Sequence, residues 1–430
     1  MDIFALSIIK KSQIMKYLLF FLLLTFSVFP QNKINQEHLQ SNFALKESKK
    51  AFKEGLLNKI DRTFSAPLNS NSEAKWMELF GEVGLQLYKS EKVYNAISVA
   101  SKYAPNGSIK FKRALVEAII TLYPNDFEKT ITKFYENTND ATLFAYCAYH
   151  LSKGGKTKDE LLSETKKRFK KQNENFESIP EINFLVYYLE NDSILTPSLK
   201  EILSHDFVKG KTIIYSLQRK NRIYPGITII KKPNGEFVKS KNDSIFYVQQ
   251  LALSVTNLPG YLSQGNTPQG IFSVVGFYNS PTPTLGPTAA VLTRIPYEVP
   301  TKLWYHSTVT NNWNIKDYKN LLPKSWKNYL PIYESYYAGL TGRRKIVMHG
   351  SVDDLSFYDN LPFAPLTPSK GCLTTVELWS ETNGKNLRSD QAKLMNAFFS
   401  TGELKGFLVV IDIDDKKEAV KIDEVLHLLK

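Results

Sequence analysis

The chain has 430 residues, of which 43% are hydrophobic and 23% charged, so it is long enough for two or three globular domains and is neither a disordered tail nor a fibre. Two cysteines, Cys147 and Cys372, and six histidines without an HExxH pattern exclude a disulfide-rich scaffold and argue against a zinc site, so neither metal nor cofactor is expected. The net charge of +13 suits an acidic partner, but the C-terminal half, which carries most of the excess, lacks Lys/Arg runs interleaved with aromatic residues, so nucleic-acid binding is not expected.

Residues 1–30 have the pattern of an export signal. Lys10, Lys11 and Lys16 precede an apolar run, Tyr17–Phe29. As a helix this run would rise about 20 Å, which is too short for the roughly 30 Å hydrocarbon core of a bilayer but typical of a signal peptide. We therefore expect an exported protein of the periplasm or cell envelope. The alternative is an uncleaved signal that anchors the chain in the membrane.

Residues 40–210 are predicted to be all-helical. Apolar residues recur at i, i+3, i+4, i+7 and i+11, which lines one face of a helix: Trp76, Leu79, Phe80, Val83 and Leu87. Helix starts near Glu73, Ser108 and Asp140 are about 33 residues apart, the scale at which helix pairs stack into solenoids. We interpret the region as a solenoid-like array, tetratricopeptide-like or HEAT-like. It would dock a protein partner, orient the C-terminal half, or simply pack as a helical bundle.

Residues 211–415 are predicted to form a mostly-β domain. An Asn-Gly pair within 231–238 is a strong hairpin signal. Further strands are predicted at 226–230, 245–255, 266–274, 345–348 and 407–413. A helix is expected at 416–430. The predicted fold class is therefore a multidomain α plus β protein, with the helical array first and the mostly-β domain second.

Three motifs in the β domain point to cysteine chemistry. They are Thr267–Phe272 (TPQGIF), His349–Ser351 (HGS) and Ser369–Cys372 (SKGC), in this order along the chain. Together they resemble the L,D-transpeptidase family, whose YkuD-type domain is a β-sandwich with a catalytic cysteine. The resemblance covers roughly Ile227–Ile413 and leaves the helical region unassigned.

The spacing of His349 and Cys372 suits a cysteine nucleophile. Because a free thiol has a pKa of about 8.5, a nearby imidazole must take its proton or stabilise the thiolate. The separation of 372 − 349 = 23 residues allows two neighbouring strands to bring both side chains together. The amides of Gly371 and Cys372 are candidates for holding the oxyanion. By the resemblance, Ser369 would brace the cysteine loop through a side-chain hydrogen bond, and the turn at 267–268 would shape the cleft.

The resemblance also implies how the histidine is oriented. One ring nitrogen of His349 would bond a main-chain carbonyl just after it, at Gly350 or Ser351. By that analogy an acidic third residue is not required. Asp353 and Asp354 are close in sequence and are the alternative orienting groups.

Two positions depart from the family pattern. Lys370 stands where the family often has histidine, and Thr374 stands where it often has arginine or asparagine. The nucleophile Cys372 and the base His349 are unaffected by both changes. Recognition of substrate carboxylates is less well supported, because threonine cannot form the two parallel hydrogen bonds that an arginine forms with a carboxylate. Lys370, Arg343 and Arg344 are candidates to compensate as point charges, and the alternative is that they are surface residues beside a strand.

An aromatic-rich insertion spans 297–337, with ten Tyr or Trp residues that include Trp304 and Tyr336. It falls where the family carries a lid over the cleft. Exposed rings there would stack on sugars and exclude water from an acyl-enzyme. A hydrophobic insertion that packs on the sandwich explains the composition equally well.

The resemblance implies a cysteine acyltransferase that acts on peptidoglycan stem peptides. Cys372, activated by His349, would release D-alanine from a tetrapeptide stem and pass the acyl group to an amine or to water, the last giving L,D-carboxypeptidase activity. Caspase-type and papain-type arrangements fit the spacing less well. The alternative is a non-catalytic cell-wall-binding or scaffolding protein with a degenerate domain.

Overall fold

The computed structural model describes residues 33–170, 178–191, 194–307 and 312–429. The predicted export signal at 1–30 lies outside the described residues. Ile34–Lys430 forms one compact unit, apart from Met1–Lys33. Within the described ranges, none of the helices is both long enough and apolar enough to span a bilayer.

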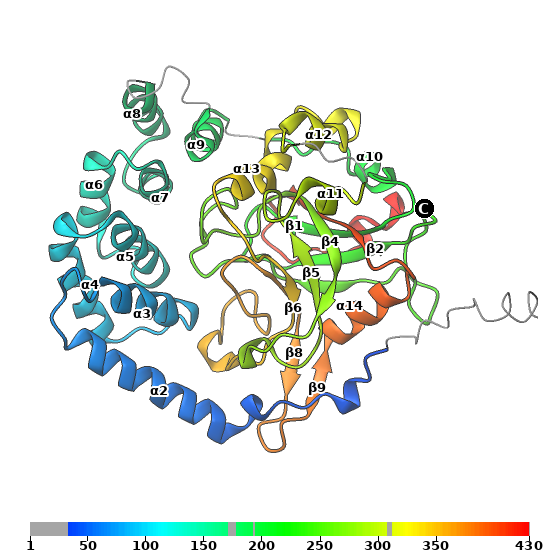
Figure 1. The fold of residues 1–430 in the computed structure, drawn as a ribbon, viewed down its shortest axis with the longest axis horizontal. Coiled ribbons are helices and arrows are strands. Elements are labelled where there is room, and N and C mark those ends of the chain that lie inside the picture. Colours follow the sequence, from blue (N-terminus) through cyan, green and yellow to red (C-terminus); the bar gives the residue numbers. More distant parts are fainter. Residues whose placement is uncertain (1–32, 171–177, 192–193, 308–311, 430) are drawn as a thin grey trace, which may run out of the picture. The chain divides into compact units, whose positions relative to one another are not determined.

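Helices build the first part of this unit (Figure 1). Their bounds are α2 (Lys46–Phe64), α3 (Glu73–Leu85), α4 (Glu91–Tyr103), α5 (Ile109–Leu122), α6 (Glu128–Asn137), α7 (Ala141–Leu151), α8 (Lys158–Lys170), α9 (Pro180–Glu190) and α10 (Leu199–Ser204). In sequence order α3 packs on α5, α5 on α7 and α7 on α9, so alternate helices stack on one another. The predicted helical array is confirmed at this level.

The predicted helix starts are also confirmed. Glu73 begins α3, while Ser108 and Asp140 are the residues just before α5 and α7. Ser108 Oγ accepts a hydrogen bond from the Phe111 amide at 3.2 Å, and Asp140 Oδ1 accepts one from Leu143 at 2.8 Å. These side chains satisfy amides that the first turn of a helix leaves without a partner, which is why the helices begin there.

Strands and four shorter helices follow. The strands are β1 (Thr212–Arg219), β2 (Gly226–Lys231), β3 (Val248–Gln250), β4 (Gly270–Tyr278), β5 (Ala290–Arg294), β6 (Met348–His349), β7 (Leu373–Thr374), β8 (Glu377–Trp379), β9 (Asn386–Ser389) and β10 (Gly406–Asp414). The helices are α11 (Thr301–Trp304), α12 (Ile315–Asn320), α13 (Glu334–Leu340) and α14 (Asp390–Phe399). The α plus β class is therefore confirmed.

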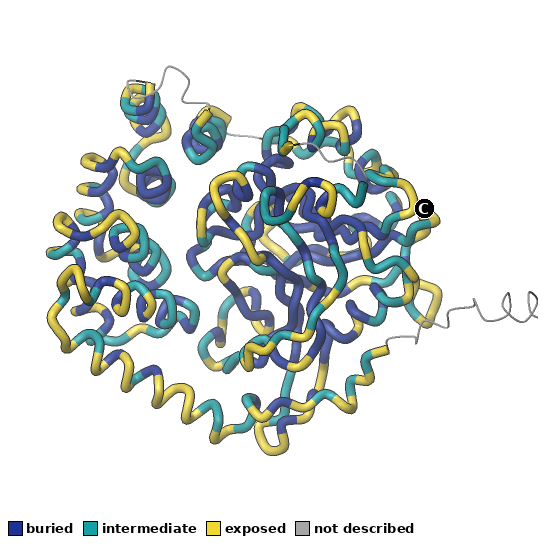
Figure 2. The backbone as a smooth tube through the Cα atoms, in the orientation of Figure 1, coloured by how far each residue is buried: buried dark blue, intermediate teal, exposed yellow. Residues whose placement is uncertain are grey.

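Eight of the described strands form one sheet, in the order β3-β2-β1-β10-β4-β5-β6-β7, and β8 pairs with β9 separately. The pairs β1/β10 and β6/β7 are parallel, and the other pairs of the large sheet are antiparallel. Every residue of β1 and β2 is buried, as Figure 2 shows for the centre of the sheet. Strands buried on both faces need not alternate between polar and apolar residues, and the polar residues of β1 are buried with the rest.

Alternate residues of the sheet enter two different hydrophobic cores. Tyr215 and Val409 face the core shared with the helical array and the aromatic insertion, whereas Ile214 and Leu408 face the core that includes α14. This two-sided division follows from the period of two in a strand. Met348 of β6 and Leu373 of β7 pack in the second of these cores.

The aromatic insertion forms α11, α12 and α13 together with short 3₁₀ helices. Trp304 and Tyr336 are both buried, with Trp304 Nε1 donating to the Arg294 carbonyl at 2.9 Å and the Tyr336 hydroxyl bonded to Tyr297 at 2.7 Å. The hypothesis that these two rings are exposed stacking surfaces is therefore wrong. The insertion packs as a hydrophobic layer on the sheet, because large rings gain more from burial than from exposure.

The predicted helix at 416–430 is also wrong. The segment forms two 3₁₀ turns, η9 (Ile422–Glu424) and η10 (Leu426–Leu428). Arg219 of β1 bonds the carbonyls of Glu418 and Ala419 at 3.0 and 3.3 Å and the Glu424 carboxylate at 2.6 Å. These tertiary bonds use main-chain carbonyls that a continuous helix would need for itself.

Candidate active site

His349 ends β6, and Cys372 immediately precedes β7, the neighbouring strand at the edge of the sheet. Strands β6 and β7 run parallel, with His349 opposite Thr374, and the Leu373 amide bonds the Val347 carbonyl at 3.0 Å. Cys372 immediately precedes β7, two residues before Thr374. The fold therefore places the two residues that the motifs singled out on adjacent segments at one edge of the sheet.

The His349 ring is held by its own main chain. Nδ1 lies 2.5 Å from the Gly350 carbonyl oxygen. A carbonyl can only accept, so Nδ1 carries the proton and the neutral ring presents a lone pair at Nε2. Burial lowers the pKa of His349, and the bond to Gly350 opposes this. His349 is therefore a neutral base at neutral pH.

The acidic alternatives do not orient this ring. Asp353 accepts from the Ser351 hydroxyl at 2.6 Å, and Asp354 caps a short 3₁₀ helix by accepting from the Ser356 amide at 3.0 Å. Of the two carbonyls considered, the one that bonds the ring is Gly350. The Ser351 carbonyl instead accepts from Trp379 Nε1 at 3.0 Å.

The Cys372 thiol is partly exposed and turned toward the main chain. Sγ donates to the Lys345 carbonyl at 3.5 Å. Burial raises the pKa of Cys372, and the Glu298 carboxylate adds to this; the Val347 amide and the Arg343 charge oppose it. In the part of the chain that the structure describes, no hydrogen bond joins Sγ to the His349 ring. The thiol is thus neutral, and its bond to Lys345 must break before the sulfur can pass its proton to a base.

The cysteine loop is braced by Ser369 and Thr267. Ser369 Oγ accepts from the Gly371 amide at 3.0 Å and donates to the Cys372 carbonyl at 2.9 Å, so the side-chain bond expected of Ser369 is present. Thr267 Oγ1 donates to the Gly371 carbonyl at 3.0 Å. The Gly371 amide is therefore occupied and unsuited to hold an oxyanion. The Cys372 amide has no hydrogen-bond partner among the described residues and is the better candidate.

Arg343 braces segment 260–266, which lies next to Gly371 of the cysteine loop. Its buried guanidinium donates to the carbonyls of Gly260 at 2.5 Å, Leu262 at 3.3 Å and Asn266 at 2.8 Å, and also to Gly265. Burial lowers its pKa to about 10.

Gly371, beside this guanidinium, has a φ of +107°, and a Cβ there would collide with the guanidinium. Glycine is therefore required at 371 both for backbone conformation and for space. Arg343 serves the loop and is not free to bind a substrate carboxylate.

Arg343→Met is expected to lower the free energy of unfolding by about 3 kcal/mol or more, because buried carbonyls lose their donor. Arg344→Met is the matched control, since Arg344 is exposed and donates to the Gly339 and Arg343 carbonyls. We expect the control to change stability by about 0.5 to 1 kcal/mol. Urea unfolding of both variants measures the difference. Equal losses would contradict the role assigned to Arg343.

The predicted substrate-binding residues are dispersed. Thr374 is buried, and its hydroxyl donates to the Thr367 carbonyl at 2.6 Å, so the prediction that it faces substrate is wrong. Lys370 reaches the helical array instead of the cysteine, because a Cβ placed on Gly81 of α3 would lie 2.9 Å from its Nζ. Arg344 is exposed close to the cysteine loop and remains a candidate for binding a substrate carboxylate.

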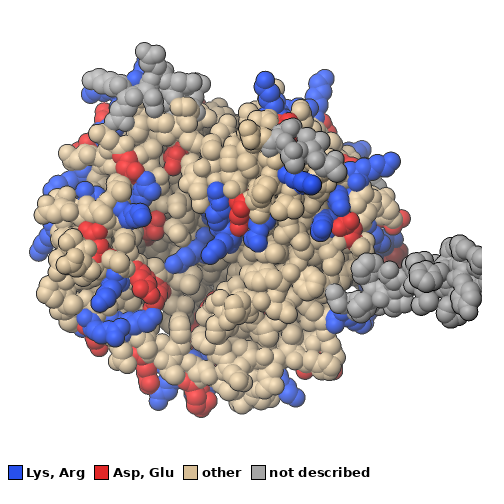
Figure 3. Space-filling view, in the orientation of Figure 1, with Lys and Arg blue, Asp and Glu red and all other residues tan. Residues whose placement is uncertain are grey.

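Three residues near Cys372 were missed by sequence reasoning. Burial raises the pKa of Tyr278 at the end of β4; Cys372 raises it further, and Arg294 of β5 lowers it. Arg294 Nη1 lies 3.2 Å from Glu298 Oε1. Figure 3 shows Lys and Arg side chains gathered near the centre of this face, in the region between α13 and β6. These residues carry no sequence motif and meet only because β4, β5 and β6 are adjacent.

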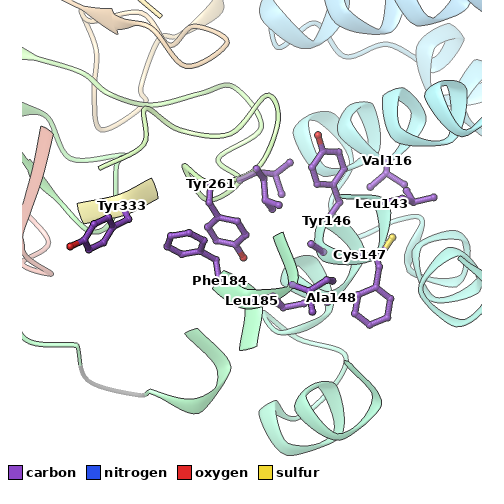
Figure 4. Close-up of a cluster of buried hydrophobic side chains, with 14 of the residues drawn as sticks. Val116, Leu143, Tyr146, Cys147, Ala148, Phe184, Leu185, Tyr261 and Tyr333 are labelled. Carbon is purple, nitrogen blue, oxygen red and sulfur yellow. The ribbon is translucent and has the colours of Figure 1, made fainter. Parts of the chain in front are cut away.

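The helical array contacts the loop that surrounds Arg343. The Tyr146 hydroxyl of α7 lies 3.0 Å from Glu117 Oε1 and 2.8 Å from the Ser263 carbonyl (Figure 4 shows Tyr146 in this junction). One hydroxyl proton cannot serve both acceptors. Burial raises the pKa of Glu117 to about 7, with the Tyr146 bond and the Lys370 and Arg113 charges opposing this. When Glu117 is protonated, its carboxyl group can donate to Tyr146, which then donates to Ser263.

Within the described ranges, no group of three or more His, Cys, Asp or Glu side chains is arranged to hold a metal ion. The candidate site therefore consists of a base-competent imidazole, a partly exposed thiol, one unpaired amide and a braced loop. Compared with known proteins, the chain matches no family model, no curated protein and no solved structure.

Proposed function

We propose that the chain is an L,D-transpeptidase with a YkuD-like catalytic domain, exported to the cell envelope. The observation that carries the proposal is the orientation of His349, whose Nδ1 is engaged by Gly350 so that Nε2 is left as a base, one strand away from Cys372. The fixed tautomer leaves the other ring nitrogen able to accept a proton. The YkuD-like fold is proposed from the three sequence motifs, and export is proposed from the signal-like pattern of residues 1–30.

The proposed reaction begins with a rotation of the thiol away from Lys345. The Sγ proton passes to Nε2 of His349, and Sγ bonds the carbonyl carbon that precedes the terminal D-alanine of a tetrapeptide stem. The oxyanion accepts a hydrogen bond from the Cys372 amide. When the C–N bond breaks, the imidazolium gives its proton to the leaving D-alanine amine. A thioester remains on Cys372.

The second half of the reaction reverses these transfers. An acceptor amine, or water, gives a proton to Nε2 and attacks the thioester carbon. The S–C bond breaks, and the imidazolium returns its proton to sulfur. A stem amine gives a cross-link, a protein lysine gives an anchored protein, and water gives carboxypeptidase activity.

The test is incubation of the purified wild-type chain with a disaccharide tetrapeptide. We expect release of D-alanine, detected by mass spectrometry, together with one cross-linked or hydrolysed product. A carbapenem is expected to add covalently, with the mass shift mapping to Cys372 after proteolysis. A folded protein that releases no D-alanine and takes up no carbapenem would contradict the proposal.

The alternative is a non-catalytic wall-binding or scaffolding protein. One observation favours it: the thiol bonds Lys345 and not His349, and burial raises its pKa. Alkylation by iodoacetamide separates the two. If the protein is an enzyme, the rate at which Cys372 is alkylated should fall in His349→Gln. If it is a scaffold, the alkylation rate should depend only on ionisation of the thiol and be the same in His349→Gln as in the wild-type chain.

A further inference from the structure

The main chain of Lys345 contacts two different groups of the candidate site. Its carbonyl accepts from Cys372 Sγ at 3.5 Å, and its amide donates to Glu298 Oε1 at 3.2 Å. Lys345 has a φ of +60°, in the left-handed region that residues other than glycine rarely adopt. Such a conformation persists only where the surrounding contacts hold it. A contact that holds Lys345 therefore also sets where its carbonyl meets the thiol.

The Glu298 carboxylate supplies this contact and is itself firmly held. Besides the Lys345 amide, Oε1 accepts from Arg294 Nη1 at 3.2 Å, and Oε2 accepts from the Ile295 amide at 3.2 Å. The Glu298 side chain is only 9% exposed. Hydrogen bonds from main-chain amides and a guanidinium to a carboxylate are among the stronger ones in proteins. Because both oxygens are engaged, the carboxylate cannot leave Lys345 without losing several bonds.

A turn after β5 brings Glu298 to Lys345. The Glu298 amide donates back to the Ile295 carbonyl at 3.2 Å, which closes the turn. Ile295 and Ile346 are buried in the same hydrophobic core, and the Thr293 hydroxyl donates to the Ile346 carbonyl. The turn and the segment before β6 are thereby packed against each other by contacts separate from the cysteine loop.

This arrangement favours the protonated form of the thiol. A thiol can donate to the Lys345 carbonyl but a thiolate cannot, so the bond is lost when the sulfur ionises. Burial is the largest cause of the raised pKa of Cys372, and the negative charge of Glu298 adds to it, whereas the Arg343 charge opposes it. Tyr278 also lies near the sulfur, and its own pKa is raised, so it stays neutral. Glu298 therefore disfavours the thiolate both by its charge and through Lys345.

We propose that Glu298 is a positioning residue that keeps the Cys372 thiol in a resting, protonated position, acting through the main chain of Lys345. Its meaning for catalysis rests on the proposed function: the proton must leave Sγ before a thioester can form, so Glu298 sets how readily the first step begins. The thiolate is also the form that oxidants attack. A resting position that keeps the sulfur protonated protects it between turnovers.

The experiment measures alkylation of Cys372 by iodoacetamide in the full chain from about pH 6 to pH 10, with the adduct mapped by mass spectrometry after proteolysis. Glu298→Gln keeps the size of the side chain and removes its charge. We expect alkylation at neutral pH to become about threefold faster or more, because a fall of about half a pKa unit triples the thiolate fraction. The midpoint of the pH profile should move downward, which a merely structural loss would not cause.

Glu403→Gln is the matched control. Glu403 also accepts from a main-chain amide, that of Lys405 at 2.9 Å, and pairs with a lysine, Lys211, at 3.1 Å. It precedes β10, which β4 and β5 separate from β6. Its alkylation profile should be that of the wild-type chain.

Two variants of Lys345 test the main-chain part of the proposal independently. Lys345→Asn and Lys345→Val remove the same charge and are similar in size, but asparagine tolerates the left-handed conformation and valine does not. Valine should therefore weaken the contact between the Lys345 carbonyl and the thiol. We expect Cys372 to be alkylated about threefold faster or more in Lys345→Val than in Lys345→Asn.

The proposal is overturned if Glu298→Gln, with a normal melting curve, is alkylated no faster than the wild-type chain, or if Glu403→Gln is accelerated equally. Should Glu298→Gln not fold, equal rates in the two Lys345 variants overturn it. Alkylation needs no stem peptide, so the proposed function fails separately. Faster alkylation of Glu298→Gln in a chain that releases no D-alanine removes the enzyme and keeps the positioning role, whereas D-alanine release with unchanged alkylation does the reverse.

Discussion

Cys372→Ala is expected to abolish D-alanine release, lowering the rate by about 10⁴-fold or more, because the thioester cannot form without the sulfur. The thiol side chain is small and partly exposed, so its removal should leave the fold unchanged. Mass spectrometry of the released D-alanine measures the effect, and thermal melting verifies the fold. The variant should also take up no carbapenem.

Cys147→Ala is the matched control for this experiment. Cys147 is fully buried in α7, and burial raises its pKa well above the ordinary range, so it is not a nucleophile. We expect normal D-alanine release per folded molecule and a stability loss of about 1 kcal/mol at most, because little volume is removed. Release that persists in Cys372→Ala, or disappears in Cys147→Ala, would refute the assignment of the nucleophile.

His349→Gln is expected to slow D-alanine release by about 10² to 10⁴-fold, the usual contribution of a positioned general base. In the wild-type chain, kcat/KM should rise with pH as the imidazole loses its proton. Burial lowers the pKa of His349, so this rise should be centred below the ordinary value of about 6.5. Protonation removes the base, so activity is lost toward acid pH.

The pH profile separates a general base from an ion pair. In His349→Gln the acid limb should disappear, and the remaining activity should increase only as the thiol ionises, at a pH raised by burial of Cys372. A wild-type rate that instead follows thiol ionisation above about pH 8.5 would show that His349 is not the base. His150→Gln, a histidine on α7, is the matched control and should keep the wild-type profile.

Local signals predicted much of the helical array. Ser108 and Asp140 begin helices because their side chains cap the first turn, and this interaction needs only the next three residues. The strand at 407–413 was equally clear, since a long apolar β-branched run suits a strand buried on both faces. The helix predicted at 416–430 failed because bonds from Arg219 outweigh local helix propensity.

The candidate site was predicted in part. His349 and Cys372 stand in a motif, and the strand spacing allowed them to meet. The destinations of Lys370, Thr374 and Arg343 were not predictable, because a long or polar side chain beside a strand has the same sequence pattern whether it faces substrate, the array or a neighbouring loop. The aromatic insertion was ambiguous for the same reason.

By itself, then, the sequence determined the order of helices and strands, the helix caps and the pair of residues that carries the proposed chemistry. These depend on neighbours along the chain or on a strand period of two. Only the tertiary structure decided that Arg343 braces segment 260–266, that Tyr146 ties the helical array to Ser263, and that Thr267 bonds the Gly371 carbonyl. Each of these depends on main-chain carbonyls or hydroxyls brought together from distant segments, and hydrogen bonds to the main chain leave no mark on residue type.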